Sequence, residues 1–271
     1  AWRVFHKADR TLRCHHCGCA ERVPRACPEC GNLDIAPLGR GTEKLEEQIR
    51  LALPGARVAR IDADSTRAKG ALQARLTAVH AGEVDVLVGT QMVTKGLDFD
   101  HVSTVAILNA DNLMRFPDFR AHERAFQLME QVSGRAGRKQ AQGKVIIQTA
   151  NPKHPLLQLV KQHDYKQFYA LEIAKRKEFF YPPYSRVILV TLKHKDRQVV
   201  TAAAEKLATL LKQDLREYII GPAAPVVNRI RNQYLMEVLI KLPKEPGMSN
   251  RYKAAIRNYI NLVNVEKPFK S

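Results

Sequence analysis

The sequence has 271 residues, of which 45% are apolar and 26% are charged, so it can form a globular protein of two or three domains. No apolar run approaches the roughly 18 residues needed to cross a bilayer. Nothing at its start resembles a signal peptide, and we expect a cytoplasmic protein or a piece of one.

The net charge of +17 points to a polyanionic partner, with simple solubility as the alternative. The charge is uneven along the chain. Lys and Arg number 22 against 17 Asp and Glu in residues 1–150, and 22 against 10 in residues 151–271. The second part of the chain is therefore expected to carry a basic surface that follows a phosphate backbone.

Residues 1–38 contain all five cysteines of the sequence. Four of them form two CxxC pairs, separated by nine residues, and four thiolates at this spacing can surround a tetrahedral zinc ion. Cys19 is left over. Four protein ligands leave no open position for catalysis, so we predict a structural zinc module. Its predicted ligands are Cys14, Cys17, Cys27 and Cys30.

Residues 39–150 alternate apolar strands with amphipathic helices. This order predicts an α/β fold with a parallel sheet covered by helices on both faces, and functional loops at the carboxyl ends of the strands. Thr90 and Asp111 follow two of those strands. The expected strands are 58–61, 84–88, 102–108 and 144–149, and the expected helices are 42–53, 69–80 and 119–129.

The segment Gln131 to Arg138 places two arginines three residues apart, each after a glycine. On a helix or its first turn, both guanidinium groups would project from one face. Such a pair matches phosphate oxygens and stabilises a transferring phosphoryl group. We interpret Arg135 and Arg138 as arginine fingers at the edge of a RecA-like sheet; two solvated loop arginines are the alternative.

Residues 151–184 read as a helical linker over 151–178, followed by the aromatic and proline-rich joint 179–184. Residues 185–271 read as a small α+β domain that supplies much of the positive charge, so we expect it to bind DNA. Its expected strands are 187–192 and 234–241, and its expected helices are 199–215 and 250–262. Its candidate DNA contacts are Arg229 and Arg231.

Several segments carry a family resemblance. QVSGRAGR resembles motif VI of the superfamily 2 helicases. Behind the CxxC cluster, GRGTEKLEEQI, RIDADST, GTQMVTKGLDF, QVSGRAGR, IIQTANPKHPLLQ and YPPY follow in the order found in the primosomal protein N′ family of bacterial replication-restart DNA helicases. The resemblance implies the C-terminal portion of an ATP-dependent 3′→5′ helicase, with residues 39–150 as its second RecA-like lobe.

The resemblance also implies roles for individual residues. Arg135 and Arg138 would reach the γ-phosphate of ATP held by a first lobe, and Gln131 would position them. A loop after the second strand would touch the DNA backbone and couple that contact to the nucleotide. The residues of this loop, which corresponds to motif V, are Thr90, Gln91, Lys95, Gly96 and Asp98. Asp100 stands where the family usually has proline, a departure that concerns only the local loop shape.

Two helicase motifs are absent from the sequence, the GxxxxGK[ST] phosphate loop and the DExH box. We therefore expect ATP and Mg²⁺ only together with a first lobe, and no ATP hydrolysis by this chain alone. The family carries four cysteine pairs that bind two zinc ions in an interleaved way, and the last two pairs are present here. They either collapse around one zinc ion or form a poorly ordered module, and both outcomes stay open.

The resemblance implies partners as well. These are branched and single-stranded DNA, single-stranded-DNA-binding protein and other primosome proteins, and a monomer associated with the bacterial nucleoid is expected. The function implied is binding to stalled forks and restart of replication by helping to load the replicative helicase. The main alternative is a non-enzymatic, zinc-containing DNA-binding or adaptor module; an RNA helicase is a third possibility.

Overall fold

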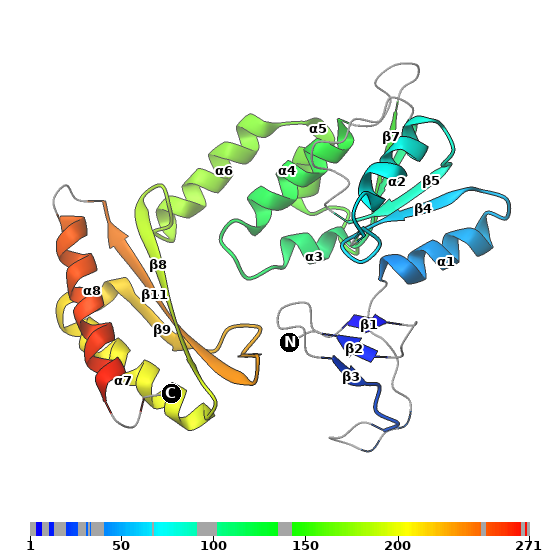
Figure 1. Cartoon of the computed structure of the whole chain (residues 1–271). Helices are drawn as coiled ribbons and strands as arrows, with labels where there is room; N and C mark the ends of the chain where they lie inside the picture. Colours follow the sequence, from blue (N-terminus) through cyan, green and yellow to red (C-terminus); the bar gives the residue numbers. More distant parts are fainter. Residues whose placement is uncertain are drawn as a thin grey trace. The chain divides into compact units, whose positions relative to one another are not determined.

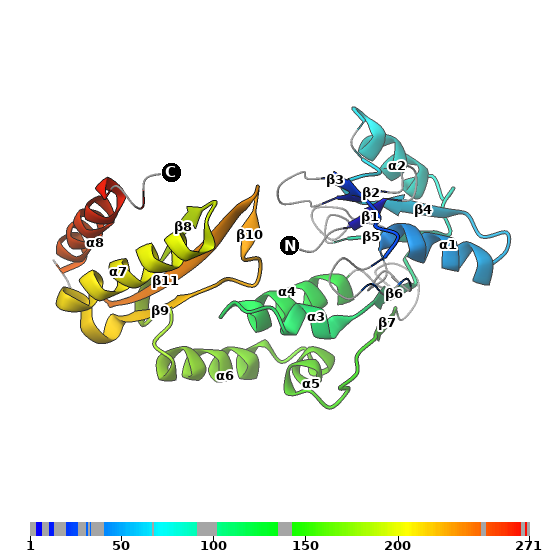
Figure 2. The same ribbon diagram turned by 90° about the horizontal axis from the view of Figure 1, so that it is seen from below.

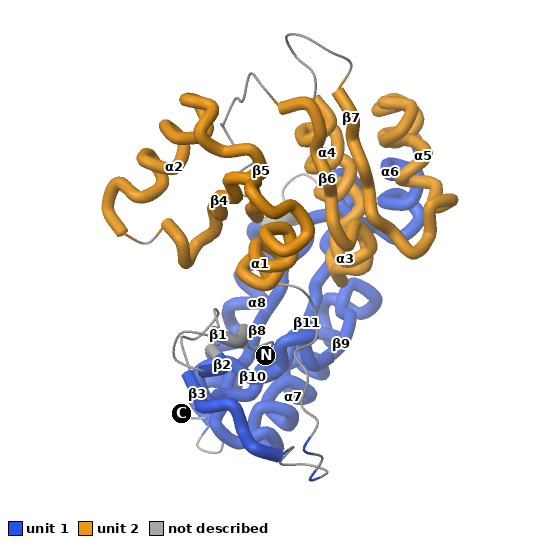
Figure 3. Tube along the Cα trace, turned by 90° about the vertical axis from the view of Figure 1, so that its right-hand side faces the viewer, with its two compact units in different colours: residues 1–37, 171–271 blue, residues 38–170 orange. Residues whose placement is uncertain are grey.

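The fold is known from a computed structural model (Figure 1, Figure 2). It divides into two compact units, residues 1–37 with 171–271 and residues 38–170 (Figure 3). No helix within the described residues is long and apolar enough to cross a membrane. The structure describes residues 4–6, 11–13, 20–26, 31, 33, 41–66, 68–90, 102–134, 143–244, 248–266 and 269.

The first strands of the chain form a small antiparallel sheet of β1 (Val4–His6), β2 (Thr11–Arg13) and β3 (Ala20–Arg22). Arg13 pairs with Ala20, so the first CxxC pair belongs to the segment that connects two paired strands. The four predicted zinc ligands themselves lie outside the described residues. Among the described residues, no group of three or more His, Cys, Asp or Glu side chains could hold a metal ion.

A parallel pair of strands opens the second unit. Helix α1 (Thr42–Ala52) precedes β4 (Val58–Ile61), and α2 (Ala71–His80) connects β4 to β5 (Val86–Gly89). The strands pair from Val58 with Val86 to Ile61 with Gly89. Ile61 and Leu76 are buried together between strand and helix. The parallel pairing predicted from the apolar runs is confirmed here.

A second parallel pair follows, β6 (Thr104–Ile107) with β7 (Lys144–Ile147). Between them come α3 (Ala110–Met114) and α4 (Ala121–Ser133). Within the described part of the chain these strands form two separate pairs rather than the one continuous sheet that we expected. Residues 91–101, between β5 and β6 in the chain, all lie outside that part.

The linker holds two helices instead of the single helical run predicted over 151–178. Helix α5 (Pro155–Gln162) starts with proline at its first position, where the missing N–H costs nothing. His154 Nδ1 accepts a hydrogen bond from the Leu156 amide at 3.2 Å and caps it. His163 then takes a left-handed conformation, with φ of 54°, and ends α5 before α6 (Tyr165–Glu178) begins.

A stacked aromatic pair packs α6 against α4. The rings of Phe126 and Phe168 are stacked with centroids 4.3 Å apart and an angle of 5° between their planes. Both side chains are buried, and Met129 lies in the same apolar cluster. This cluster fixes the face that α4 turns to the core.

The C-terminal domain is an antiparallel sheet with α7 and α8 packed on one face (Figure 1). Strand β11 lies between β8 on one side and β9 and β10 on the other. The two predicted strands and two predicted helices are confirmed; β9 and β10 were not predicted. The elements are β8 (Ser185–His194), α7 (Arg197–Leu215), η2 (Arg216–Tyr218), β9 (Ile219–Ala223), β10 (Arg229–Ile230), β11 (Gln233–Pro243) and α8 (Met248–Val265).

The stacked ring pair gives a test of this packing. Phe168→Ala should destabilise the unit of residues 38–170 by about 3–5 kcal/mol, because it removes a buried ring and leaves a cavity. Loss of hydrogen-exchange protection in α4 would report the change. Tyr169→Ala is the matched control, because Tyr169 is the next residue on α6 and its side chain is 54% exposed. Equal loss of protection in both variants would contradict the packing described.

Candidate functional site

The structure describes only four of the residues predicted to contact nucleotide, DNA or metal. These are Thr90, Gln131, Arg229 and Arg231. The remaining candidates lie outside the described residues, so their placement stays a prediction. They are Gln91, Lys95, Gly96, Asp98, Arg135, Arg138, Cys14, Cys17, Cys27 and Cys30.

Gln131 lies in the last turn of α4, and its side chain is exposed. On the opposite side of the helix, Phe126, Met129 and Val132 are buried. The segment Gln131 to Arg138 therefore begins inside the end of a helix, and not at the helix start that the spacing also allowed. The Gly134 amide donates to the Glu130 carbonyl at 3.0 Å and closes this last turn.

Thr90 directly follows β5, at the carboxyl end of the strand, and is exposed. Ile61 pairs with Gly89, so Asp62 and Thr90 are the next residues along two adjacent parallel strands. This is the edge where parallel sheets place their functional loops. The position of Thr90 agrees with the sequence prediction, while its contact with DNA stays untested.

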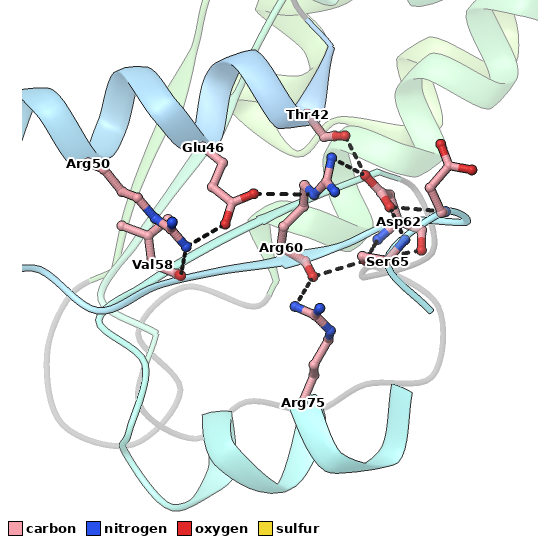
Figure 4. A network of polar contacts seen from close by, with 9 residues as sticks. Thr42, Glu46, Arg50, Val58, Arg60, Asp62, Ser65 and Arg75 are labelled. Carbon is pink, nitrogen blue, oxygen red and sulfur yellow. Dashed lines mark hydrogen bonds and ion pairs between the residues drawn. The ribbon is translucent and has the colours of Figure 1, made fainter. Parts of the chain in front are cut away.

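Asp62 is the centre of a polar network at that edge (Figure 4). Its side chain is buried and accepts a hydrogen bond from the Thr42 hydroxyl at 2.5 Å and from the Ser65 amide at 2.7 Å. Arg60 lies 3.5 Å away as an ion-pair partner. Burial by itself would raise the pKa of Asp62, but these donors outweigh it and hold the pKa below its ordinary value.

The network continues along α1 and α2. Glu46 accepts from Arg60 at 3.2 Å and from Arg50 at 2.7 Å, and Arg75 donates to the Arg60 carbonyl at 2.8 Å (Figure 4). Side chains from α1, β4 and α2 are thus tied together around the first residues of α1. Asp62 is fully engaged as an acceptor, which suits a structural anchor better than a general base.

A second carboxylate anchors the neighbouring parallel pair. Asp111, just after β6, accepts from the Ala150 amide at 2.8 Å and from the Thr149 hydroxyl at 2.9 Å. These two hydrogen bonds lower the pKa of Asp111. The bond from the Ala150 amide has the larger effect, and the bond from the Thr149 hydroxyl adds to it. The sequence predicted Asp111 near the functional edge of the sheet. In the structure, its carboxylate oxygens hold the segment after β7 against α3.

Arg229 and Arg231 lie on a single hairpin of the C-terminal domain. Arg229 is in β10, and Arg231 is in the two-residue turn that leads into β11. Both side chains are exposed. The sequence placed them in one basic domain, and the structure brings them to one tip.

The Thr42–Asp62 hydrogen bond makes a pH-dependent prediction. Thr42→Val should lower the free energy of unfolding by about 2 kcal/mol at pH 7, as expected for a hydrogen bond to a charged acceptor. Because the folded pKa of Asp62 is depressed, this stabilisation is present above about pH 4 and is lost as the pH falls through the folded pKa. Urea unfolding at pH 7 and below pH 3 measures the difference.

Thr77→Val is the control for that comparison. The Thr77 hydroxyl donates to the Gln73 carbonyl at 3.0 Å, which does not titrate. Its effect should therefore be the same at both pH values. A Thr42→Val effect that persists undiminished at low pH would contradict the role given to Asp62.

Comparisons with known proteins agree with the two structural parts described above. Residues 37–140 match the family described as the helicase conserved C-terminal domain, and residues 177–268 match the primosomal protein N C-terminal domain. The first match contains β4 to α4, and the second contains β8 to α8.

Relatives with the same printed name match most of the chain. Replication restart protein PriA of Bacillus subtilis is 44% identical over 94% of this chain and 32% of its own length. The proteins of that name from Synechocystis and Treponema pallidum are 43% and 41% identical, over 86% and 90% of this chain and 28% and 37% of their own lengths. The chain thus spans about a third of the length of these relatives. It belongs to the family of PriA replication restart proteins. It carries two of their domains, the helicase conserved C-terminal domain and the primosomal protein N C-terminal domain.

Proposed function

We propose that this chain is the C-terminal portion of an ATP-dependent 3′→5′ DNA helicase that binds stalled or branched forks and restarts replication. The observation that carries the proposal is the helicase C-terminal domain match over residues 37–140, which contains both GTQMVTKGLDF and QVSGRAGR. The printed name of the relatives supports the restart role. By the same resemblance, the protein helps to load the replicative helicase.

Within this proposal the chain supplies one side of an ATP site. Arg135 and Arg138 stabilise charge on the γ-phosphate, and Gln131 orients them. ATP and Mg²⁺ are held by a first lobe, because this sequence contains neither the phosphate loop nor the DExH box. Gly96 and Asp98 connect the nucleotide side of the lobe to its DNA contacts. The chain by itself does not hydrolyse ATP.

DNA is held through its backbone in two places. Thr90, Gln91 and Lys95 offer hydroxyl, amide and ammonium donors to phosphates without reading bases. The C-terminal domain adds a basic surface for branched DNA, to which Arg229 and Arg231 belong. Single-stranded-DNA-binding protein and other primosome proteins are the protein partners that the family resemblance implies.

The cysteine module holds a structural zinc ion in this proposal. The donor set fits zinc: four soft thiolates in two CxxC pairs, the first of them on the connection between the paired strands β2 and β3. Bound zinc would join the two CxxC pairs through Cys14, Cys17, Cys27 and Cys30. No catalytic step uses the metal, because four protein ligands close its coordination sphere.

The arginine pair has a direct test. In a protein that joins this chain to a first lobe, Arg135→Ala or Arg138→Ala should lower DNA-stimulated ATP turnover by about 10³-fold or more, the range found for arginine fingers. DNA binding should be retained. Arg124→Ala is the control, because this exposed arginine on α4 pairs with Asp118 at 2.8 Å. Full turnover in both finger variants would instead favour the non-enzymatic adaptor.

The zinc assignment has its own measurement. Elemental analysis of the purified chain should give about one zinc ion per molecule, the number that four thiolates can bind. Cys27→Ser should reduce this content, whereas Cys19→Ser should leave it unchanged. A zinc-free chain that is otherwise folded would show that two cysteine pairs are insufficient.

A further inference from the structure

The hairpin between β10 and β11 has an unusual turn. Its two central residues, Arg231 and Asn232, have φ angles of 49° and 61°. Positive φ at both positions is the mark of a type I′ turn, which usually takes Asn or Gly because those residues tolerate left-handed backbone. Asn232 fits this preference. Arg231 does not, and it holds a long charged side chain in a conformation that disfavours it.

The side chain of Arg231 does nothing for the hairpin that would offset this strain. It is exposed, and within the part of the chain that the structure describes it has no hydrogen bond and no ion pair. A residue that is strained and contributes no local contact points to a role outside the fold. Figure 2 shows the hairpin at the end of the sheet, reaching past α7 and α8.

Arg229 is held beside this tip in a prepared position. Its guanidinium lies 4.9 Å from the centroid of the Tyr234 ring and donates a hydrogen bond to the Asn232 side-chain oxygen. Tyr234 pairs with Arg229 on one side and with His194 on the other, so the three side chains form one row across the sheet. A guanidinium that is already ordered loses little conformational freedom when it binds a phosphate.

Further positive charge lies at the end of the adjacent strand. Lys193 and Lys195 are both exposed, and Lys193 pairs across the sheet with Leu235. Arginine and lysine heads around a narrow tip suit phosphate oxygens and carry no information about base sequence. Arg229 covers the ring of Tyr234, which is itself half-buried, so this ring is a poor platform for stacking unpaired bases. These features favour duplex over single-stranded DNA.

We propose that the β10–β11 hairpin is a clamp for the backbone of duplex DNA, with Arg231 at its tip and Arg229 as a second phosphate contact. The proposal deepens the DNA-binding function proposed above and rests on it. It assigns duplex binding to one structured element of the C-terminal domain. A basic surface alone would instead distribute the contacts over the whole domain.

The decisive variant is Arg231→Gly in the 271-residue chain. Glycine accepts the positive φ without strain, so the thermal unfolding midpoint should stay the same or rise. Loss of one phosphate contact should make the slope of log K against log salt shallower by about 0.9. If the variant and the unaltered chain bind equally at 1 M salt, the variant then binds about eightfold more weakly at 0.1 M salt. Fluorescence anisotropy with a labelled blunt duplex measures the affinity and its salt slope.

Two further variants complete the design. Arg257→Ala removes the same charge from an exposed site on α8 and should change duplex affinity much less than Arg231→Gly does. Arg231→Lys keeps the charge and should restore most of the salt slope. A labelled single strand of the same length is the second probe, and its affinity should change less than that of the duplex.

Each other result overturns the proposal in a recognisable way. Equal losses for Arg231→Gly and Arg257→Ala would show diffuse charge instead of a clamp, and the broader DNA-binding function would stand. A larger loss on the single strand would reassign the tip to unpaired DNA. If the unaltered chain binds neither probe, the DNA-binding function itself fails together with the clamp. A lower thermal midpoint for Arg231→Gly, with affinity unchanged, would make the turn purely structural.

Discussion

The buried face of α4 is the constraint on which the proposed nucleotide chemistry depends. Phe126 stacks on Phe168 at 4.3 Å, and Met129 is fully buried beside it. Because a helix is stiff over this length, the packing of these side chains also determines where Gln131 and the end of α4 lie. A guanidinium that completes a site from across a cleft is effective only when it is placed within hydrogen-bond reach of developing charge. The apolar cluster of residues 38–170 is therefore part of the proposed ATP machinery, although none of its members is proposed to bind ATP.

The carboxyl edge of β4 and β5 shows a second constraint, which is electrostatic. A buried carboxylate at an edge proposed to meet DNA phosphates would repel them if it were uncompensated. Asp62 is compensated by Arg60 and by the Thr42 hydroxyl, and the same contacts fix the start of α1. Thr90 follows the adjacent strand at this edge and carries no charge. The arrangement thus combines a rigid loop base with an edge whose buried negative charge is neutralised.

The sequence predicted what depends on local pattern. Apolar runs gave the strands that pair in parallel, and the helices and the long strands of the C-terminal domain were also foreseen. The break between α5 and α6 was missed, because it depends on a left-handed His163 that leaves no signature in the hydrophobic pattern. The Thr42–Asp62 contact was missed because it joins residues 20 positions apart through tertiary packing. The turn at Arg231 was missed because Arg-Asn is not a usual turn sequence, so only the charge of Arg229 and Arg231 was read.

The proposed motor function requires that Arg135 and Arg138 act on a transferring phosphoryl group. The most direct measurement uses a protein that contains both lobes, with ADP and aluminium fluoride as a mimic of the transition state. The unaltered protein is expected to trap the mimic tightly in the presence of DNA. Arg138→Ala is expected to abolish trapping while leaving the affinity for ADP alone nearly unchanged. Equal trapping by both proteins would contradict the arginine-finger role.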